Sequence, residues 1–316
     1  MEYDEFSAMN TTVVSAAEGA QAHLQRGFAR VRRFVAAAEQ RFSRFRPTSE
    51  LSQLNEAAGG WFPVSADMMA VLQEAQALHE LTGGLFDPAV LPALINAGYD
   101  RNMDELRYLH LPTITQAAAA PPFSAICLDV DHCAVYMPAG MEIDLGGIAK
   151  GWIAARAADL LSTYCDACAV SAGGDMALVG LPAGQPHWLV SLEDPRDPER
   201  VLSVLRVGPG GLATSSVTRR SWPQGDALRH HIIDPRDGQS ARTSWLSVTV
   251  FSEKTTSAEA LAKALLIAGP HVGPALAGRV PGLRFVAVQP DGAIWGTPAS
   301  KEMLHVPTPS ELIPFR

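Results

Sequence analysis

The chain has 316 residues, of which 47% are hydrophobic and 18% are charged. This length supports a sizeable core in one large domain or two ordinary ones, and the composition excludes a disordered, collagen-like or coiled-coil protein. With 33 acidic against 25 basic residues and a formal net charge of −8, the chain lacks the basic character of a nucleic-acid-binding protein.

The cysteines and the first residues bear on the cell compartment. Four cysteines are too few to form a disulfide scaffold for a chain of this length. The opening MEYDEFSAMN is acidic and has no apolar segment typical of a secretory signal peptide. No apolar run approaches the ~18 residues that a membrane span needs. We therefore expect a cytoplasmic protein without a membrane span.

Apolar periodicity predicts the elements of the first half of the chain. In chain order, these are a short strand at 11–14, helices at 16–42 and 67–81, a loop at 114–123 and a hairpin over 125–136. Gly83 and Gly84 are expected to end the second helix, since glycine favours the position after a helix.

The second half alternates strands, turns and helices. The expected elements are a strand from Met141 that leads through a Gly-rich turn into a helix at 148–161, strands at 169–171, 188–192 and 201–207, a Thr/Ser-rich turn at 213–218, strands near 230–233 and 246–252, and a helix at 257–268 ended by Gly269 and Pro270. The chain has no internal repeat, no long polar linker and no regular βαβ rhythm. We predict one integrated α+β domain over 1–316, with mixed or antiparallel sheets flanked by helices.

The segment from Asp144 to Gly151, DLGGIAKG, has the strongest chemical character. Its glycines follow an expected strand and allow a ligand to approach the backbone, while the start of the next helix offers N–H groups to a phosphate. Lys150 adds a positive charge suited to a phosphate oxygen. The structural alternative is an ordinary strand-to-helix turn with a solvated lysine. The spacing matches neither a Walker A loop nor a GxGxxG dinucleotide motif.

Three further motifs have a functional and a structural interpretation. The segment 173–175, GGD, is either a second loop for a ligand or an ordinary turn. His231 lies before the turn 234–238 and suits a proton acceptor, or it has a structural role. Cys165 and Cys168 lie between a helix end and a strand, with no second pair at zinc-ribbon spacing, so we interpret them as structural.

Two other segments leave both interpretations open. In GLFDP at 84–88, Phe86 and Asp87 suit a binding loop, or a core residue and a cap. The arginine-rich segment that begins at Arg44 and runs into a short helix suits a site or a solvated surface.

Taken in order, these motifs resemble those of the ApbE family, the FAD:protein FMN transferases. The similar segments are AMNT at 8–11, FSRFRPTSELSQLN at 42–55, GLFDP at 84–88, IDLGGIAKG at 143–151, SAGGD at 171–175, ATS at 213–215 and HIIDP at 231–235. Collinear matches are more specific than any single motif. The resemblance implies an ApbE-like, T-fold-related architecture. It also implies a reaction that cleaves the pyrophosphate of FAD, transfers FMN to a Ser or Thr hydroxyl of an acceptor protein, and releases AMP.

The resemblance also implies residue roles. Contacts with FAD are implied at Met9, Leu85, Phe86, Asp87, Asp144, Lys150 and Ile233. His231 matches a base that activates the acceptor hydroxyl. The family implies Mg²⁺, held by the backbone carbonyl of Gly147 and by the side chains at positions 259 and 263.

The metal positions depart from the family pattern A-D-x-x-x-T. Glu259 replaces the Asp and keeps a carboxylate one methylene further out, whereas Lys263 replaces the Thr with an ammonium that cannot coordinate Mg²⁺. We therefore expect weak or no dependence on Mg²⁺. Asn10 and Ser216 replace family glycines, and we expect crowding at both positions.

Two alternatives to the transferase stay open. One is an FAD pyrophosphatase that releases FMN and AMP with water in place of the acceptor hydroxyl. The other is a non-catalytic FAD-binding module with a degenerate metal site. The expected partners are FAD and an acceptor protein, without nucleic acid.

Overall fold

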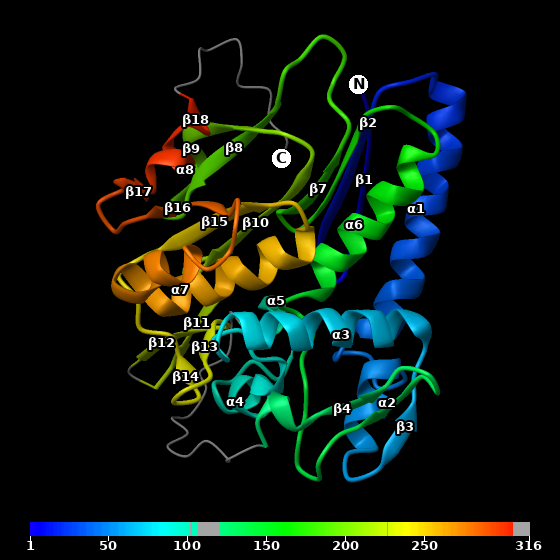
Figure 1. The fold of residues 1–316 in the computed structure, drawn as a ribbon, viewed down its shortest axis with the longest axis vertical. Helices are drawn as coiled ribbons and strands as arrows, with labels where there is room; N and C mark the ends of the chain where they lie inside the picture. The colour runs from blue at the N-terminus through cyan, green and yellow to red at the C-terminus, as the bar shows by residue number, and fades with distance from the viewer. Residues whose placement is uncertain (102, 107–120, 226, 306–316) are drawn as a thin grey trace. The chain divides into compact units, whose positions relative to one another are not determined.

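The computed structural model describes residues 1–101, 103–106, 121–225 and 227–305 (Figure 1). The chain forms two compact units, each built from segments that are distant in sequence. Unit 1 comprises Met1–Val35, Lys150–Arg219 and Thr243–Arg316, and unit 2 comprises Ala36–Ala149 and Arg220–Arg242. That the two units together form one integrated domain over residues 1–316 stays a prediction. The loop expected at 114–123 lies mostly outside the described residues.

Unit 1 contains an eight-stranded antiparallel sheet with the strand order β1-β2-β6-β7-β10-β15-β16-β17 (Figure 1). Its strands are β1 (Glu2–Ala8), β2 (Thr11–Ala17), β6 (Cys168–Ala172), β7 (Asp175–Val179), β10 (Gly210–Ser216), β15 (Ser247–Ser252), β16 (Arg284–Val288) and β17 (Ile294–Gly296). Three of these strands, β7, β10 and β15, lie beside one another in the middle of the sheet.

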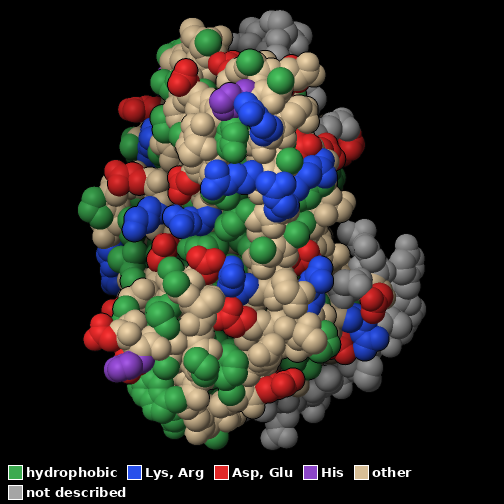
Figure 2. All heavy atoms as spheres, turned by 90° about the vertical axis from the view of Figure 1, so that its right-hand side faces the viewer, with side chains coloured by type: hydrophobic (Ala, Val, Ile, Leu, Met, Phe, Trp, Pro, Cys, Tyr) green, Lys and Arg blue, Asp and Glu red, His purple; other side chains and the backbone are tan. Residues whose placement is uncertain are grey.

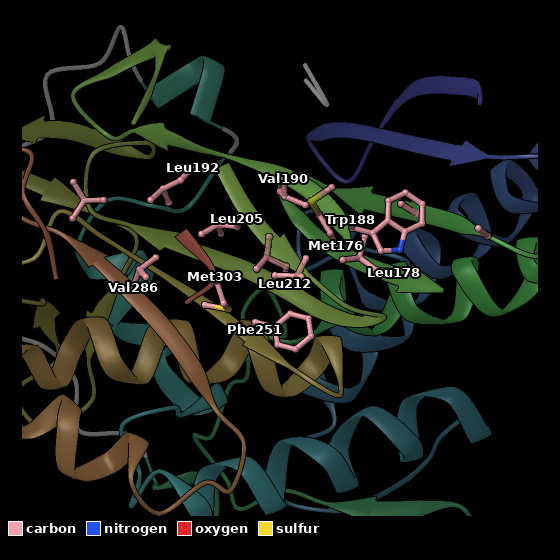
Figure 3. Close-up of a cluster of buried hydrophobic side chains, with 14 residues drawn as sticks. Met176, Leu178, Trp188, Val190, Leu192, Leu205, Leu212, Phe251, Val286 and Met303 are labelled. Carbon is pink, nitrogen blue, oxygen red and sulfur yellow. The ribbon is translucent and has the colours of Figure 1, made fainter. Parts of the chain in front are cut away.

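A second, three-stranded antiparallel sheet of unit 1 has the order β18-β9-β8. Its strands are β8 (Trp188–Asp194), β9 (Asp197–Val207) and β18 (Leu304–His305). Figure 3 shows the buried hydrophobic cluster to which both sheets contribute, with Trp188 and Leu205 from one sheet and Leu212 and Phe251 from the other. Because side chains alternate along a strand, Val250 lies on the opposite face of the large sheet from Phe251.

Helices cover that opposite face. The helices of unit 1 are α1 (Gln21–Phe42), which continues into unit 2, α6 (Ala149–Ser162), α7 (Thr255–Ala277) and α8 (Pro298–Lys301). Helix α7 packs on β10 and β15 (Figure 1). Its regular part ends at Gly269, where φ of 65° and ψ of −172° break the helix before Pro270. The predicted end at Gly269 is therefore confirmed, although a second helical stretch follows it.

Helix α7 is also the one helix within the described part of the chain that is long and apolar enough to cross a membrane, judged by length and composition alone. Of its most apolar window, 61% is buried inside the structure. Such burial is typical of a core helix.

Unit 2 combines short helices with small sheets. Its helical elements are α2 (Glu50–Glu56), α3 (Ala66–Leu81), η1 (Pro88–Val90), α4 (Leu91–Asn96), α5 (Met103–Leu106) and η2 (Phe123–Ala125). Its antiparallel sheets are β3-β5-β4 (Trp61–Pro63, Ala134–Tyr136, Cys127–Asp129), β11-β12 (Ser221–Gln224, Ala227–His230) and β13-β14 (Ile233–Asp234, Gln239–Ser240). A buried cluster that includes Tyr99, Trp222 and Ile233 forms part of its core.

These elements confirm the α+β class and most predicted helices and strands. The strand expected near 230–233 is interrupted at residues 231–232, between β12 and β13, and two further predictions are wrong. Residues 141–145 form no strand. Residues 213–216 belong to β10 and not to a turn, because β10 pairs with β15 through Thr214 and Thr249, whose hydroxyl oxygens lie 2.8 Å apart. At 173–174, by contrast, Gly173 and Gly174 have φ of 65° and 95° and form the tight turn between β6 and β7.

Basic side chains gather on the side of the molecule that carries α1. Arg26, Arg30 and Arg33 are exposed there, and their spacing places them on one helix face. Arg32 instead pairs with Asp4 at 2.7 Å. Figure 2 shows Lys and Arg side chains in bands on this side. Helical spacing therefore creates a local basic surface that no run of Lys or Arg in the sequence indicates.

Candidate active site

A group of charged side chains lies at the start of α6 in unit 1. Lys150 donates hydrogen bonds to Asp175 at the start of β7 and to Glu259 in α7, with Lys150 Nζ 2.5 Å from Glu259 Oε1. Asp175 and Glu259 are each 3% exposed. Lys263, one turn after Glu259, is half-buried, and its positive charge acts on Asp175. We call Lys150, Asp175, Glu259 and Lys263 the charge cluster.

The approach of α7 to α6 in this cluster depends on Gly151. A Cβ atom at Gly151 would lie 2.8 Å from the carbonyl oxygen of Thr255, so a larger residue would force the helices apart. The N–H of Gly151 donates to Glu259 Oε2 at 2.8 Å. Glu259 therefore caps a first-turn amide of α6, where the helix dipole also favours negative charge. The prediction that the amides of this helix start are open to a phosphate is wrong for Gly151.

Burial and neighbouring charges shift the pKa values within the charge cluster. Burial alone would lower the pKa of Lys150, but the charges of Asp175 and Glu259 and their hydrogen bonds raise it above its ordinary value. Burial raises the pKa of Asp175 to about 7, with Lys150 acting against this rise and the negative charge of Glu259 adding to it. The Lys150 ammonium therefore stays charged near neutral pH.

The unit 1 residues at the implied metal positions do not fit Mg²⁺. Lys263 carries an ammonium, which has no lone pair to give a metal, and both oxygens of Glu259 already accept hydrogen bonds from Lys150 and Gly151. Mg²⁺ needs several oxygen ligands in an octahedral arrangement. Within the described ranges, no three His, Cys, Asp or Glu side chains come together as a metal-binding group. Gly147, the remaining implied ligand, belongs to unit 2.

In unit 2, Arg44 contacts both Asp144 and Tyr99. Arg44 Nε lies 3.4 Å from Asp144 Oδ1, and Arg44 Nη2 donates to the carbonyl oxygen of Tyr99 at 2.7 Å. The Arg44 side chain is only 7% exposed, so the interpretation of this segment as a solvated surface is wrong at Arg44. The rings of Tyr99 and His231 meet edge to face with centroids 6.4 Å apart. Tyr99 therefore connects Asp144, through Arg44, with His231.

His231 follows β12 and is half-buried. Its N–H donates to the carbonyl oxygen of Arg220 at 3.2 Å. Ile233 is 3% exposed and packs in the buried cluster with Trp222. The roles of His231 as a base and of Ile233 as an FAD contact stay predictions.

Asn55 holds the segment that carries Asp144. Its amide donates to the carbonyl oxygen of Ile143 at 3.0 Å, and its Oδ1 accepts from the N–H of Ile143 at 2.9 Å. These two bonds replace a neighbouring strand, which explains why the strand expected from Met141 is absent. The N–H of Asp144 donates to the carbonyl oxygen of Pro88 at 2.8 Å. Asp144 therefore lies beside the segment that follows Leu85–Asp87.

Leu85, Phe86 and Asp87 connect α3 to η1. Phe86 is 2% exposed, and Asp87 Oδ1 accepts a hydrogen bond from the N–H of Ala89 at 2.7 Å. Burial raises the pKa of Asp87, while the Ala89 N–H and the charge of His79 act against that rise. These contacts fit a core residue and a cap. Contacts of these residues with FAD stay a prediction.

Met9 and Asn10 form the turn between β1 and β2 in unit 1. Both have left-handed backbones, with φ of 53° and 54°, which asparagine tolerates better than most residues. Ser216, by contrast, is extended in β10, and its hydroxyl donates to the carbonyl oxygen of Leu246 at 3.1 Å. The crowding expected at Ser216 is therefore wrong. Met9 as an FAD contact stays a prediction.

The structure brings the implied residues together in two groups. Lys150, Glu259 and Lys263 meet in unit 1, and Asp144, His231 and Ile233 lie around Tyr99 in unit 2. Sequence reasoning gave no role to Asn55 and Tyr99, left Arg44 open between a site and a solvated surface, and named Asp175 only within the segment GGD. Three of these four residues, all except Tyr99, lie inside the collinear motifs at 42–55 and 171–175, so membership of a motif is the signal that indicates them.

Comparisons with known proteins agree on one family. The family model described as "ApbE family" matches residues 9–287. The FAD:protein FMN transferase of Treponema pallidum is 30% identical over 273 residues, covering 78% of this chain and 72% of the relative. The Vibrio cholerae protein of the same name is 30% identical over 251 residues, covering 78% and 74%.

Solved structures support the same fold. The crystal structure of the ApbE protein from Thermotoga maritima is 27% identical, with a TM-score of 0.84 over 96% of this chain and 100% of that chain. The flavin transferase ApbE from Vibrio cholerae is 24% identical, with a TM-score of 0.77 over 96% and 99% of the two chains. Because the family model matches most of this chain, residues 9–287, the chain belongs to the ApbE family.

Proposed function

We propose that this protein is an FAD:protein FMN transferase. The family match over residues 9–287, with relatives of that name at 30% identity, carries the proposal. The hydroxyl oxygen of a Ser or Thr in an acceptor protein attacks the phosphorus of the FMN half of FAD. A bond from this oxygen to phosphorus forms, the bond from phosphorus to the bridging oxygen breaks, and AMP leaves with that oxygen and its electron pair. The hydroxyl proton passes to a base.

We assign the base to His231. Imidazole is the side chain used most often for proton transfer near neutral pH. The neighbouring Tyr99 ring stacks on Trp222 with centroids 5.3 Å apart, and Trp222 Nε1 donates to the carbonyl oxygen of Ala97 at 2.7 Å. This rigid aromatic pair supports one orientation of the His231 ring, and a fixed orientation is what a base needs.

We assign the FAD contacts to Met9, Leu85, Phe86, Asp87, Asp144, Lys150 and Ile233. Arg44 is a positioning residue for Asp144, since its guanidinium lies 3.4 Å from that carboxylate and is itself held by Tyr99. Asn55 positions the same segment through Ile143. The cytoplasmic location expected from the sequence belongs to this proposal as well.

A non-catalytic FAD-binding module is the second candidate. Lys263 favours it, because an ammonium at an implied metal position removes a ligand that the family pattern supplies. The two candidates differ in one product, since only a transferase or a pyrophosphatase releases AMP from FAD.

One experiment separates the transferase, the pyrophosphatase and the binding module. The purified protein is incubated with FAD and with a protein extract of the source cells, and AMP is measured by chromatography while covalent flavin is detected by fluorescence on a denaturing gel. A transferase gives fluorescent bands and AMP, a pyrophosphatase gives FMN and AMP without bands, and a binding module gives neither. Absence of FAD binding at high micromolar concentration would refute the proposed function altogether.

A further inference from the structure

The charge cluster of unit 1 is balanced by its own residues. Lys150 bonds to Asp175 and Glu259, and the second oxygen of Glu259 accepts the N–H of Gly151 at 2.8 Å. Lys263 lies four residues after Glu259 in α7, which places both side chains on one helix face. Two ammonium groups and two carboxylates therefore occupy this place.

A divalent cation would compete directly with these ammonium groups. Its binding requires carboxylate oxygens that are already bonded to Lys150 and Gly151. A single positive charge a few ångströms from a divalent ion weakens its binding by at least about tenfold, even at the dielectric constant of water. Glu259 is 3% exposed, so solvent reduces this repulsion less than it would at a surface.

We infer that Lys263, acting beside Lys150, takes the place of a divalent metal ion in this chain, so that the protein binds and cleaves FAD without Mg²⁺. This inference rests on the proposed function. In the transfer step, the acceptor oxygen bonds to the FMN phosphorus and the bridging oxygen leaves with AMP. The ammonium groups meet the negative charge that develops on that oxygen, which is the electrostatic contribution that such reactions need most. The hydroxyl proton goes to the base of the proposed function.

The arrangement also explains why the lysine is accommodated at position 263. An ammonium next to a bound Mg²⁺ would repel it, whereas next to Asp175 it offsets part of a negative charge that is nearly buried. In the alternative arrangement, the Lys263 side chain points to solvent and a water molecule completes the coordination of a bound metal ion. The two arrangements predict different metal affinities.

Metal binding is measured first, without FAD, by Mn²⁺ electron paramagnetic resonance on the full chain. The wild type is expected to bind no Mn²⁺ at millimolar concentration. The variant Lys263→Thr restores an oxygen ligand and removes the repulsion, and it is expected to bind Mn²⁺ at least about tenfold more tightly than the wild type. Lys301→Thr is the matched control, since Lys301 is an exposed helical lysine in α8, and it is expected to behave as the wild type. Equal Mn²⁺ binding by the wild type and Lys263→Thr would overturn the inference.

FAD binding and AMP release are then compared in EDTA and in Mg²⁺. The wild type is expected to give the same FAD affinity and the same rate in both, and Lys263→Thr to lose rate in EDTA and regain it in Mg²⁺. Lys263→Met removes the charge without adding a ligand, and its rate of AMP release is expected to fall in EDTA and in Mg²⁺ alike. This variant tests the inference if Lys263→Thr does not fold. A wild type that is active only with Mg²⁺ would overturn the inference and leave the proposed function standing. A wild type that neither binds nor cleaves FAD would refute the proposed function, while the Mn²⁺ titration would still decide whether the ammonium groups exclude the metal.

Discussion

Replacing Lys150 with methionine is expected to destabilise unit 1 strongly. The change keeps the length of the side chain but leaves Asp175 and Glu259, each 3% exposed, without the ammonium that both contact. Removing one partner of a buried ion pair costs about 3–5 kcal/mol. Because Lys263 still acts on Asp175 and the Gly151 N–H still bonds to Glu259, we expect the lower end, about 3 kcal/mol.

Urea unfolding followed by circular dichroism measures this loss. Lys301→Met is the matched control, since an exposed lysine away from any cluster changes the free energy of unfolding by no more than about 0.5 kcal/mol. A second change, Glu259→Gln in the Lys150→Met background, removes one uncompensated charge and is expected to recover part of the loss. If Lys150→Met costs less than about 1 kcal/mol, or if the second change recovers nothing, the cluster is solvated and this reasoning is wrong.

Three further predictions test other parts of the molecule. His231→Ala is expected to lower the rate of FMN transfer about 10²–10⁴-fold while FAD binding by fluorescence quenching is retained; equal losses of both would indicate a structural role. Asn55→Ala leaves both backbone groups of Ile143, which is 0% exposed, without their partners. A loss of about 2–4 kcal/mol in urea unfolding is expected, and a loss within the scatter of exposed substitutions would contradict the role of Asn55. Hydrogen bonds from Arg196 lower the pKa of Asp194 from 3.8 to about 2. Asp194 therefore contributes stability that is present above about pH 4 and is lost as the pH falls through about 2. Asp194→Asn is expected to lower the melting temperature at neutral pH and to weaken the decrease of the melting temperature between about pH 4 and about pH 2. If the variant and the wild type show the same decrease, Asp194 is not the group responsible.

The helices could be predicted from the sequence because their apolar stripes are continuous. Buried residues of α1 recur at steps of three and four from Leu24 to Phe42, and those of α3 from Met68 to Leu78. The predicted end of regular helix at Gly269 also agrees, since the positive φ there suits glycine alone. Periodicity and glycine positions are local signals, and they do not depend on distant partners.

The errors at 141–145 and 213–218 arise from distant partners. The apolar run from Met141 suits a strand, but its hydrogen bonds go to the side chain of Asn55, which is 88 residues away from Ile143. Thr214 and Ser215 have turn-like composition, but β15 pairs with both and converts them into a central strand. No pattern within either segment indicates which residue elsewhere will pair with it.

The sequence predicts the motifs that carry the site residues, but it does not predict that these residues fall into one group in unit 1 and another in unit 2. The order of the motifs indicates Asp144, Lys150 and His231. It does not indicate that Arg44 and Tyr99 connect Asp144 with His231, because Tyr99 lies in no motif and the sequence leaves Arg44 open between a site and a surface. The sequence places Asp175 only in a short glycine-containing loop or turn. Its significance comes from 3% exposure beside Lys150, and burial is a property of the folded chain.

The two departures at the implied metal positions are best understood as one change. Glu259 reaches Lys150 with one oxygen at 2.5 Å and the N–H of Gly151 with the other at 2.8 Å. An aspartate would draw the carboxylate back by about 1.5 Å, the length of one carbon–carbon bond, and would break at least one of these contacts. The longer side chain thus directs the carboxylate toward α6 and its lysine, and Lys263 adds a second ammonium at a position where the family pattern implies a metal ligand. Glu259 keeps a carboxylate but engages both of its oxygens, and Lys263 removes an oxygen ligand, so both departures act against Mg²⁺ in the same way.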